Sequence, residues 1–315
     1  MARHRFLISL ITKDNDYQRE QATAAEDVAR TLGVDIQITY ADSDAITQSQ
    51  QLLEVIQSAN ASEFCGIIVE PAGGTSMTQV GRAAIQAGIG WVILNREIDT
   101  IGELRKLSDV PVFSVSSDHE EVGRIQGRQF GALLPKGGLV LYLQGPSASH
   151  AAQRRATGLQ ATKPRNIALK VLKCTNWTEA SAHQAVTSWL GVRDAHKERI
   201  DLVAGQNDLI AIGARKALKD DLAEAEGSGF GKVRFTGVDG LPKTGQAWTR
   251  SGILAATVVV PPNTMPALKM LVQAARDRSQ PPEQTLVAPY SFPELKELGA
   301  GKEEDGLDPT DDGWK

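Results

Sequence analysis

Two segments near the middle of the chain place polar side chains directly after short apolar runs. Residues 204–208 read Ala-Gly-Gln-Asn-Asp and residues 235–240 read Phe-Thr-Gly-Val-Asp-Gly, and a helix-like stretch follows each. In an open parallel sheet, such residues lie in the crevice beyond the carboxyl ends of the strands. A carboxylate accepts from two hydroxyl groups, and an amide both donates and accepts. We therefore predict that Asn207, Asp208 and Asp239 lie in that crevice as a hydroxyl-binding set.

The elements that must position these residues alternate between strand and helix. Short buried-strand runs at residues 66–69 and 91–94 flank a helix pattern, and a second series of the same kind begins at residue 112. Strands that alternate with helices imply right-handed βαβ units and a parallel sheet. We therefore predict an α/β fold with two similar lobes. The strand predicted at residues 253–260 ends at two prolines, which suits a strand that crosses from one lobe to the other.

Length and composition narrow the class of protein. A chain of 315 residues suggests two domains, because single hydrophobic cores stop growing near ~250–300 residues. The hydrophobic share of 41% and the charged share of 23% are ordinary for a soluble globular protein. A net charge of −4 argues against a nucleic-acid partner, which selects a basic surface. No apolar stretch approaches the roughly 20 residues of a membrane span.

The reactive residue types give no sign of a metal site, a cofactor or a catalytic centre. Cys65 and Cys174 are too few for a disulfide framework or a zinc site, and we expect buried free thiols. The histidines show no metal-ligand spacing. Ser149 and His150 are neighbours on a first helical turn, so they do not face each other as nucleophile and base. We expect no catalytic residues, no metal and no cofactor.

Two sequence motifs lie close together in the second half of the chain. They are Gln206-Asn207-Asp208-x-x-Ala211-x-Gly213-Ala214-x-x-Ala217-Leu218 and Gly237-Val238-Asp239-Gly240. This order resembles the ribose-binding-protein type of sugar-binding protein, a group of the type I periplasmic binding proteins whose fold LacI-type repressors share in their effector domain. The resemblance covers roughly residues 5 to 290.

The resemblance implies two Rossmann-like lobes with parallel sheets, joined by a hinge of three crossings that closes on a ligand like a clamp. A repressor is not expected, because the first strand begins near residue 5 and leaves no room for a helix-turn-helix headpiece. The lobes are predicted as follows: residues 1–116 plus 262–287 form the N-terminal lobe, residues 117–261 plus 288–295 form the C-terminal lobe, and residues 296–315 form an acidic tail.

Residues 14–18 follow the first strand, where the family has an asparagine followed by aromatic residues. The resemblance implies that Asn15 hydrogen-bonds the ligand and that Tyr17 covers its apolar face. The alternative is a helix N-cap, which Asp14, Asn15 or Asp16 could supply. Gln18 stands where the family often has a second aromatic residue, which makes the pocket less suited to stacking on a sugar.

Asn95 and Arg96 follow the strand run 91–94, where the family has Asp-Arg. The resemblance implies that both contact the ligand, since a guanidinium donates a planar fork of hydrogen bonds to hydroxyls or a carboxylate. Asparagine in place of aspartate leaves this end of the pocket more positive, which would favour an acidic ligand. The alternative for Arg96 is an interlobe salt bridge. Ser117 and His119 fall at a hinge crossing and are further candidates for ligand contact.

Four further ligand contacts are implied in the second lobe. Arg155 matches the family's binding arginine, and Asn207 and Asp239 are the family's hydroxyl-binding pair. Trp177 matches an aromatic residue whose indole stacks on the C–H face of a sugar; the alternative is a hydrophobic lid over its own helix. Val260 stands where ribose-type proteins carry a hinge glutamine. Ribose is therefore not the expected ligand, and the ligand is expected to present an apolar edge there.

The resemblance implies non-catalytic binding of a small polar, sugar-like solute by the solute-binding component of an ABC-type sugar transporter. The expected partners are that ligand and an ABC permease, and the expected state is a monomer. The family works in the periplasm, yet the apolar run 6–11 is shorter than the roughly 7–15 residues of a secretory h-region. One alternative is a cytoplasmic ligand sensor that a signalling partner reads. A further alternative is a doubly wound enzyme that acts on a carbohydrate.

Overall fold

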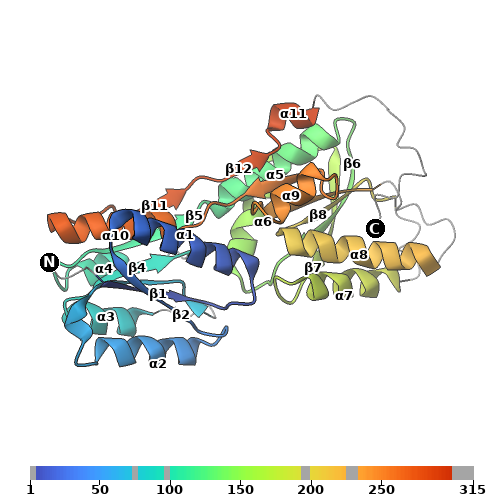
Figure 1. The fold of residues 1–315 in the computed structure, drawn as a ribbon. Coiled ribbons are helices and arrows are strands. Elements are labelled where there is room, and N and C mark those ends of the chain that lie inside the picture. Colours follow the sequence, from blue (N-terminus) through green and yellow to red (C-terminus); the bar gives the residue numbers. More distant parts are fainter. Residues whose placement is uncertain (1–4, 73–76, 96–99, 193–198, 225–232, 300–315) are drawn as a thin grey trace.

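The chain forms two α/β lobes that lie side by side (Figure 1). The computed structural model describes residues 5–72, 77–95, 100–192, 199–224 and 233–299, and for residues 222–224 it describes the backbone alone. Each lobe contains one six-stranded sheet with helices on both faces. None of the described helices combines the length and the apolar character needed to cross a membrane.

The N-terminal lobe is built on an all-parallel sheet in the order β11-β5-β4-β3-β1-β2. Its strands are β1 (Arg5–Leu10), β2 (Asp35–Tyr40), β3 (Phe64–Val69), β4 (Gly90–Leu94), β5 (Val112–Ser117) and β11 (Gln284–Val287). One face is covered by α1 (Asp16–Leu32) and α10 (Thr264–Asp277). The other face is covered by α2 (Ala45–Ile56), α3 (Thr78–Gln86) and α4 (Ile101–Arg105), and the short 3-10 helix Ala61–Glu63 precedes β3.

The C-terminal lobe repeats this arrangement in the order β12-β10-β9-β8-β6-β7. Its strands are β6 (Gly138–Gln144), β7 (Ile167–Lys173), β8 (Leu202–Gly205), β9 (Arg234–Asp239), β10 (Ala256–Val259) and β12 (Tyr290–Phe292). Here β12 is antiparallel to β10, and the other pairs are parallel. Helices α5 (His119–Leu133), α6 (His150–Thr162) and α11 (Leu295–Gly299) cover one face, and α7 (Glu179–Leu190), α8 (Asp208–Glu224) and α9 (Gly245–Arg250) cover the other.

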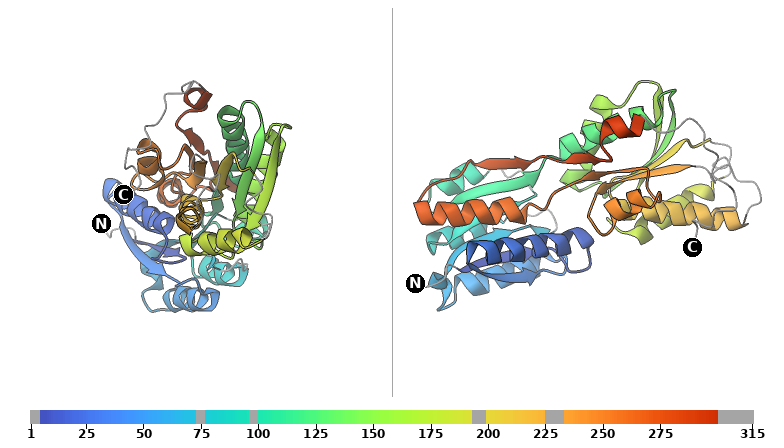
Figure 2. Two further views of the ribbon diagram at one scale, coloured as in Figure 1. Left: turned by 90° about the vertical axis from the view of Figure 1, so that its right-hand side faces the viewer. Right: turned by 45° about the horizontal axis from the view of Figure 1, so that its top comes forward.

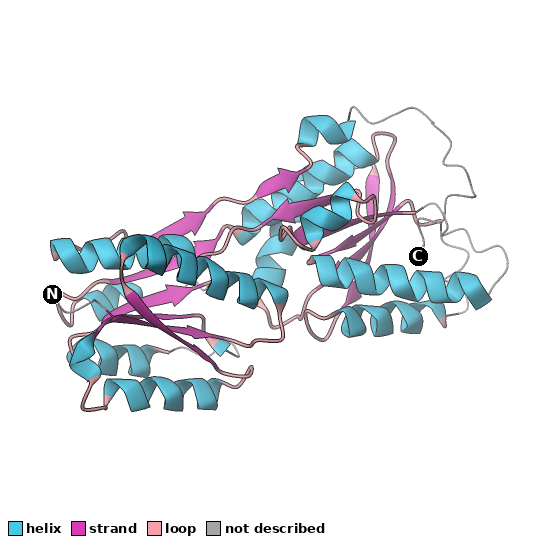
Figure 3. Cartoon of the chain, viewed as in Figure 1, coloured by secondary structure: helices cyan, strands magenta, loops and turns pink. Residues whose placement is uncertain are grey.

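The chain passes between the lobes at three places. It crosses after β5, after β10, and between β11 and β12, and the three crossings can be followed in Figures 2 and 3. Helix α10 returns to the N-terminal lobe, where it packs beside α1. The prediction of two similar lobes with mostly parallel sheets is confirmed, whereas the residue-level boundaries of the lobes stay a prediction.

Local sequence signals explain where several of these elements begin and end. Helix α1 ends at Gly33, whose left-handed φ of 66° costs a glycine little. The Asp118 carboxylate caps α5 by accepting from the backbone N–H of Glu121 at 2.8 Å, as the capping-box spacing predicts. Strand β3 is buried on both sides: Ile67 packs toward α2 and α3, and Ile68 toward α1 and α10. This double burial explains why the strands read as continuous apolar runs.

The structure differs from the sequence prediction in a few elements. Strand β10 begins at Ala256 rather than at residue 253, because Leu254 packs into the core beside α7 and α8 before the ladder starts. Six short elements were not predicted, since each is too short to show a period: the 3-10 helix 61–63, α4, α9, β11, β12 and α11. Among these, β12 is an antiparallel edge strand in a sheet expected to be parallel.

Candidate functional site

A cavity of about 550 Å³ lies between the two lobes, beyond the carboxyl ends of both sheets. Side chains of both lobes line it: Ile11, Thr12, Asp14, Asn15, Tyr17, Gln18, Ser43, Glu70 and Asn95 from the N-terminal lobe, and His119, Ser149, Ala151, Arg155, Asn176, Trp177, Thr178, Asn207, Leu209 and Asp239 from the other. The structure thus brings together seven of the predicted site residues: Asn15, Tyr17, Asn95, Arg155, Trp177, Asn207 and Asp239. Ser117 lies just outside the cavity wall, and Arg96 lies outside the described residues.

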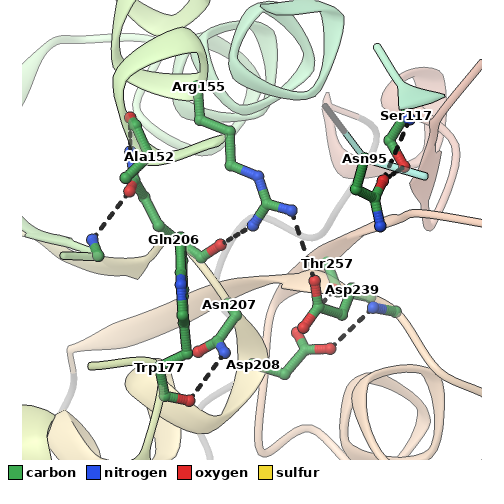
Figure 4. Close-up of polar contacts among 12 residues, drawn as sticks. Asn95, Ser117, Ala152, Arg155, Trp177, Gln206, Asn207, Asp208, Asp239 and Thr257 are labelled. Carbon is green, nitrogen blue, oxygen red and sulfur yellow. Dashed lines mark hydrogen bonds and ion pairs between the residues drawn. The ribbon is translucent and has the colours of Figure 1, made fainter. Parts of the chain in front are cut away.

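The charged centre of the site is the pair Arg155 and Asp239 (Figure 4). Nη2 of Arg155 lies 3.7 Å from Oδ1 of Asp239, and the two side chains are only 6% and 18% exposed. Nη1 of Arg155 donates to the backbone carbonyl of Gln206, and the guanidinium carbon lies 5.4 Å from the centre of the Trp177 ring. Nε of Arg155 is buried and has no partner among the described residues. The guanidinium therefore has donor capacity left for a ligand.

Burial controls the protonation of Asp239. It raises the pKa of this carboxyl group from 3.8 to about 6, while the charge and the hydrogen bond of Arg155 oppose the rise and the Asp16 carboxylate adds to it. The backbone of Asp239 has a φ of +99°, an unfavourable value for a residue with a side chain. Strained backbone of this kind is often found at ligand sites.

A close helix crossing fixes the position of Arg155. A β-carbon added at Gly123 of α5 would lie less than 3.0 Å from the carbonyl oxygen of Arg155, and one at Gly158 of α6 equally close to the carbonyl oxygen of Glu120. Only glycine lets the two helix backbones approach this far. The turn of α6 that carries Arg155 is therefore held directly against α5.

The side-chain amide of Asn207 caps a helix and also lines the cavity. Its Oδ1 accepts from the backbone N–H of Ile210 at 2.8 Å and so caps α8, while its Nδ2 donates to the carbonyl of Trp177 at 3.1 Å. The Trp177 ring packs against Gly145, where no side chain would fit. Trp177 is thus a lid on its own lobe as well as a wall of the cavity, and one Nδ2 hydrogen of Asn207 has no partner among the described residues.

The first turn of α1 supplies the opposing wall. Oδ1 of Asn15 caps this helix by accepting from the backbone N–H of Gln18 at 3.2 Å, so the N-cap alternative is correct for this oxygen. The Asn15 side chain also lines the cavity. Tyr17 presents its ring to the cavity and packs beside Val260. Burial, and after it the charge of Glu70, raises the pKa of the Tyr17 hydroxyl, so that group stays protonated.

Glu70 is a cavity residue that sequence analysis missed. It follows β3 directly and is 6% exposed; its Oε2 accepts from Nε2 of Gln18 and its Oε1 from Nδ2 of Asn95, each at 2.9 Å. Glu70 places a buried carboxyl group beside Asn95, and the expectation that asparagine in place of aspartate makes this end more positive stays a prediction. Gln18 holds Glu70 in place through the same kind of hydrogen bond. The rule that identified Asp239, a polar residue after a buried strand, would also have found Glu70.

Ser117 and Val260 lie behind the cavity wall. Ser117 is 2% exposed, and its hydroxyl accepts from Nδ2 of Asn263 at 3.1 Å. Its neighbour in the prediction, His119, does line the cavity. Val260 is 2% exposed within a small apolar cluster and is not a cavity-lining residue. Val260 packs on Tyr17 and α5, and the expectation that the ligand places an apolar edge against it stays a prediction.

The described side chains offer no place for a metal ion. In residues 5–72, 77–95, 100–192, 199–221 and 233–299, no three or more His, Cys, Asp and Glu side chains are grouped to hold one. Ser149 is the N-cap of α6, since its hydroxyl accepts from the backbone N–H of Ala152 at 3.4 Å. The polar groups of the cavity are arranged to donate and accept hydrogen bonds.

A two-lobed α/β fold with a polar cavity between the lobes defines the class of periplasmic binding proteins. Residues 6–279 match the sequence model of the family described as "Periplasmic binding protein domain". The chain belongs to this family, whose members are solute-binding proteins rather than enzymes.

Relatives and solved structures agree with this assignment. A "Putative rhizopine-binding protein" of Rhizobium meliloti is 30% identical over 73% of this chain and 71% of its own. The "D-allose-binding periplasmic protein" of Escherichia coli K12 is 26% identical over 86% of this chain and 84% of its own. The crystal structure of an ABC transporter periplasmic solute binding protein from Actinobacillus succinogenes 130z with bound D-allose has a TM-score of 0.79 at 20% identity, covering 95% of this chain and 100% of that one. That last likeness shows the fold.

Proposed function

We propose that the protein binds a small polyhydroxylated molecule, a sugar or a sugar-like cyclic polyol, in the cavity between its lobes. The observation that supports this most directly is that polar side chains of both lobes line one cavity, among them the ion pair of Arg155 and Asp239. Both side chains are mostly buried, so the surrounding fold holds their geometry.

The distribution of donors and acceptors suits hydroxyl groups. The carboxylate of Asp239 accepts from hydroxyls, the guanidinium of Arg155 donates to them, and the Nδ2 groups of Asn15 and Asn207 add donors. The rings of Tyr17 and Trp177 come from opposite lobes and cover the C–H faces of a ring. Closure of the lobes about the hinge then removes the ligand from water.

We propose a role in solute uptake, in which an ABC-type permease reads the closed form. The relatives support it by their names, which include a D-allose-binding periplasmic protein and a D-apiose import binding protein. Such a role places the protein in the periplasm. A ligand sensor would use the same closure with a different partner, since only the protein that touches the two lobes differs.

The function is tested by identifying what the purified protein retains. Mass spectrometry of the released small molecules is followed by calorimetric titration with D-allose, D-apiose, D-xylose, xylitol and myo-inositol. We expect one of these, or a retained polyol, to bind and to be recovered chemically unchanged. Conversion of the bound molecule would support an enzyme instead, and absence of binding to every polyol would refute the proposed ligand class. Fractionation of cells that express the gene from its native start then decides between periplasm and cytoplasm.

A further inference from the structure

Asp208 is a buried acid that the binding proposal does not use. It is the first residue of α8, is 4% exposed, and is not a residue of the cavity wall. Both of its carboxyl oxygens have partners: Oδ1 lies 2.7 Å from Oγ1 of Thr257, and Oδ2 accepts from the backbone N–H of Gly240 at 2.8 Å. The side chain thus links α8 to the end of β9 and to β10.

The hydrogen bond to Gly240 acts on the peptide group that follows Asp239. Asp239 has a φ of +99° and Gly240 a φ of +56°, so the backbone turns through the left-handed region at two consecutive residues. A residue with a side chain keeps such a conformation only when its surroundings enforce it. The carbonyl of this peptide group, which belongs to Asp239, accepts from the backbone N–H of Val260 at 3.0 Å. Its N–H, which belongs to Gly240, donates to the carboxyl group of Asp208.

Two glycines pack closely around the carboxyl group of Asp208. A β-carbon at Gly237 or at Gly245 would lie less than 3.0 Å from one of the two carboxyl oxygens. Strand β9 and helix α9 therefore enclose the group from two sides. Figure 4 shows Asp208 directly beside Asp239, with Arg155 on the far side of Asp239.

We propose that Asp208 is a positioning residue: its carboxyl group holds the peptide after Asp239, and thereby aims the Asp239 carboxylate at Arg155 and into the cavity. This inference rests on the proposed function, in which Asp239 contacts the ligand. Burial, and after it the charge of Asp239, raises the pKa of Asp208 well above 3.8. The hydroxyl of Thr257 donates to one carboxyl oxygen of Asp208 and the backbone N–H of Gly240 to the other, so Arg155 is left to Asp239.

The test follows the ionisation of Asp239 in the ligand-free protein by carboxyl-carbon NMR, with Asp239→Asn used to assign the signal. In Asp208→Ala the peptide after Asp239 loses its acceptor, and we expect the pKa of Asp239 to fall from about 6 toward 3.8 as the side chain moves into water. Asp208→Asn keeps an amide oxygen that accepts from the N–H of Gly240, so the pKa of Asp239 stays near 6. An equal fall in both variants would show an effect of charge rather than position and would overturn the proposal, as would no fall in Asp208→Ala.

A milder pair of variants keeps the test valid if Asp208→Ala does not fold. Thr257→Val removes the hydroxyl that contacts Asp208, whereas Thr236→Val removes an equally buried hydroxyl that has no partner among the described residues. We expect the Asp239 signal to shift in Thr257→Val and to stay in place in Thr236→Val; equal behaviour contradicts the proposal. Titration with D-allose and myo-inositol is a separate arm. If wild-type protein binds neither, the proposed ligand class loses support while the NMR result still decides the role of Asp208.

Discussion

Asn263 donates a hydrogen bond from its Nδ2 to Oδ1 of Asn95, and this bond joins the cavity wall to the hinge. Asn95 ends β4, and its Nδ2 donates to Glu70 in the cavity wall. Asn263 lies just before α10, at the crossing from β10, and the same Nδ2 also donates to Ser117 at the crossing after β5. One wall residue is therefore bonded to two of the three crossings.

This relationship predicts energetic coupling between the two asparagines. Asn95→Ala and Asn263→Ala should each lower the free energy of unfolding by about 1–3 kcal/mol, because each leaves buried polar groups without a partner. The double variant should lose clearly less than the sum, since the shared bond can be lost only once. Chemical denaturation of the four proteins measures this, with the exposed Asn60→Ala as a control. Additive losses would show that the two residues act independently.

The Arg155–Asp239 pair predicts a pH-dependent affinity. The carboxylate must be ionised to accept from ligand hydroxyls, and its pKa in the free protein is raised to about 6. As the pH falls through that value the Asp239 carboxylate becomes protonated and can no longer accept. The affinity for the ligand should therefore be nearly full at pH 7 and should decrease as the pH falls through 6. Between pH 7 and pH 5 the ionised share falls from roughly nine-tenths to roughly one-tenth, which predicts an affinity loss of about ten-fold. Calorimetry with the identified ligand across this range measures the change.

Two variants of Asp239 complete that measurement. Asp239→Ala should weaken binding about ten-fold or more at neutral pH, because a charge-assisted hydrogen bond contributes about 1.5–3 kcal/mol. Asp239→Asn cannot titrate, so its remaining affinity should be flat between pH 7 and pH 5. A pH dependence that survives in Asp239→Asn would assign the titration to another group, with His119 of the cavity wall the first to test.

Trp177 predicts an optical signal for binding. Its ring lines the cavity and lies 5.4 Å from the guanidinium of Arg155, so a ligand that enters this region changes its surroundings. Titration should change the indole fluorescence of the wild type. Trp177→Phe should abolish most of that change while it keeps a stacking ring, whereas Trp248→Phe, on the core side of α9, should leave it intact. A full signal in Trp177→Phe would restrict Trp177 to the role of a lid.

The sequence predicted those parts of the site that follow from strand ends. Asn207 and Asp239 come directly after apolar runs, and parallel strands bring such positions to one edge. Asn263 could not be predicted, because it meets Asn95 across 168 residues of chain and depends on where the β10 crossing lands. The burial of Val260 could not be predicted from the sequence either. In a strand, successive side chains alternate between faces, so a one-residue difference decides whether a side chain meets ligand or core.

The contribution of Asp208 was hidden for a related reason. Its position after a strand predicted a ligand contact, as for its neighbour Asn207. In the structure its carboxyl group is bonded to Gly240 and Thr257, and Asp208 is not among the residues that line the cavity of about 550 Å³. The sequence spacing of a residue at the start of a helix does not predict which neighbouring groups its side chain contacts.

The α5–α6 crossing gives the last prediction. Gly123→Ala should destabilise the protein by about 1–3 kcal/mol, because the new methyl group meets the backbone of α6 at Arg155. This cost acts against the gain of about 1 kcal/mol that alanine brings to an exposed helix interior. Gly123→Ala should also weaken ligand binding, because a backbone shift that relieves the steric clash moves the turn that carries Arg155. Gly131→Ala on the same helix is the matched control: its nearest neighbour is a ring carbon of the Pro164 side chain at 3.0 Å, not the backbone of α6. Thermal unfolding and calorimetric titration compare the two variants, and equal behaviour would show that the crossing does not set the position of Arg155.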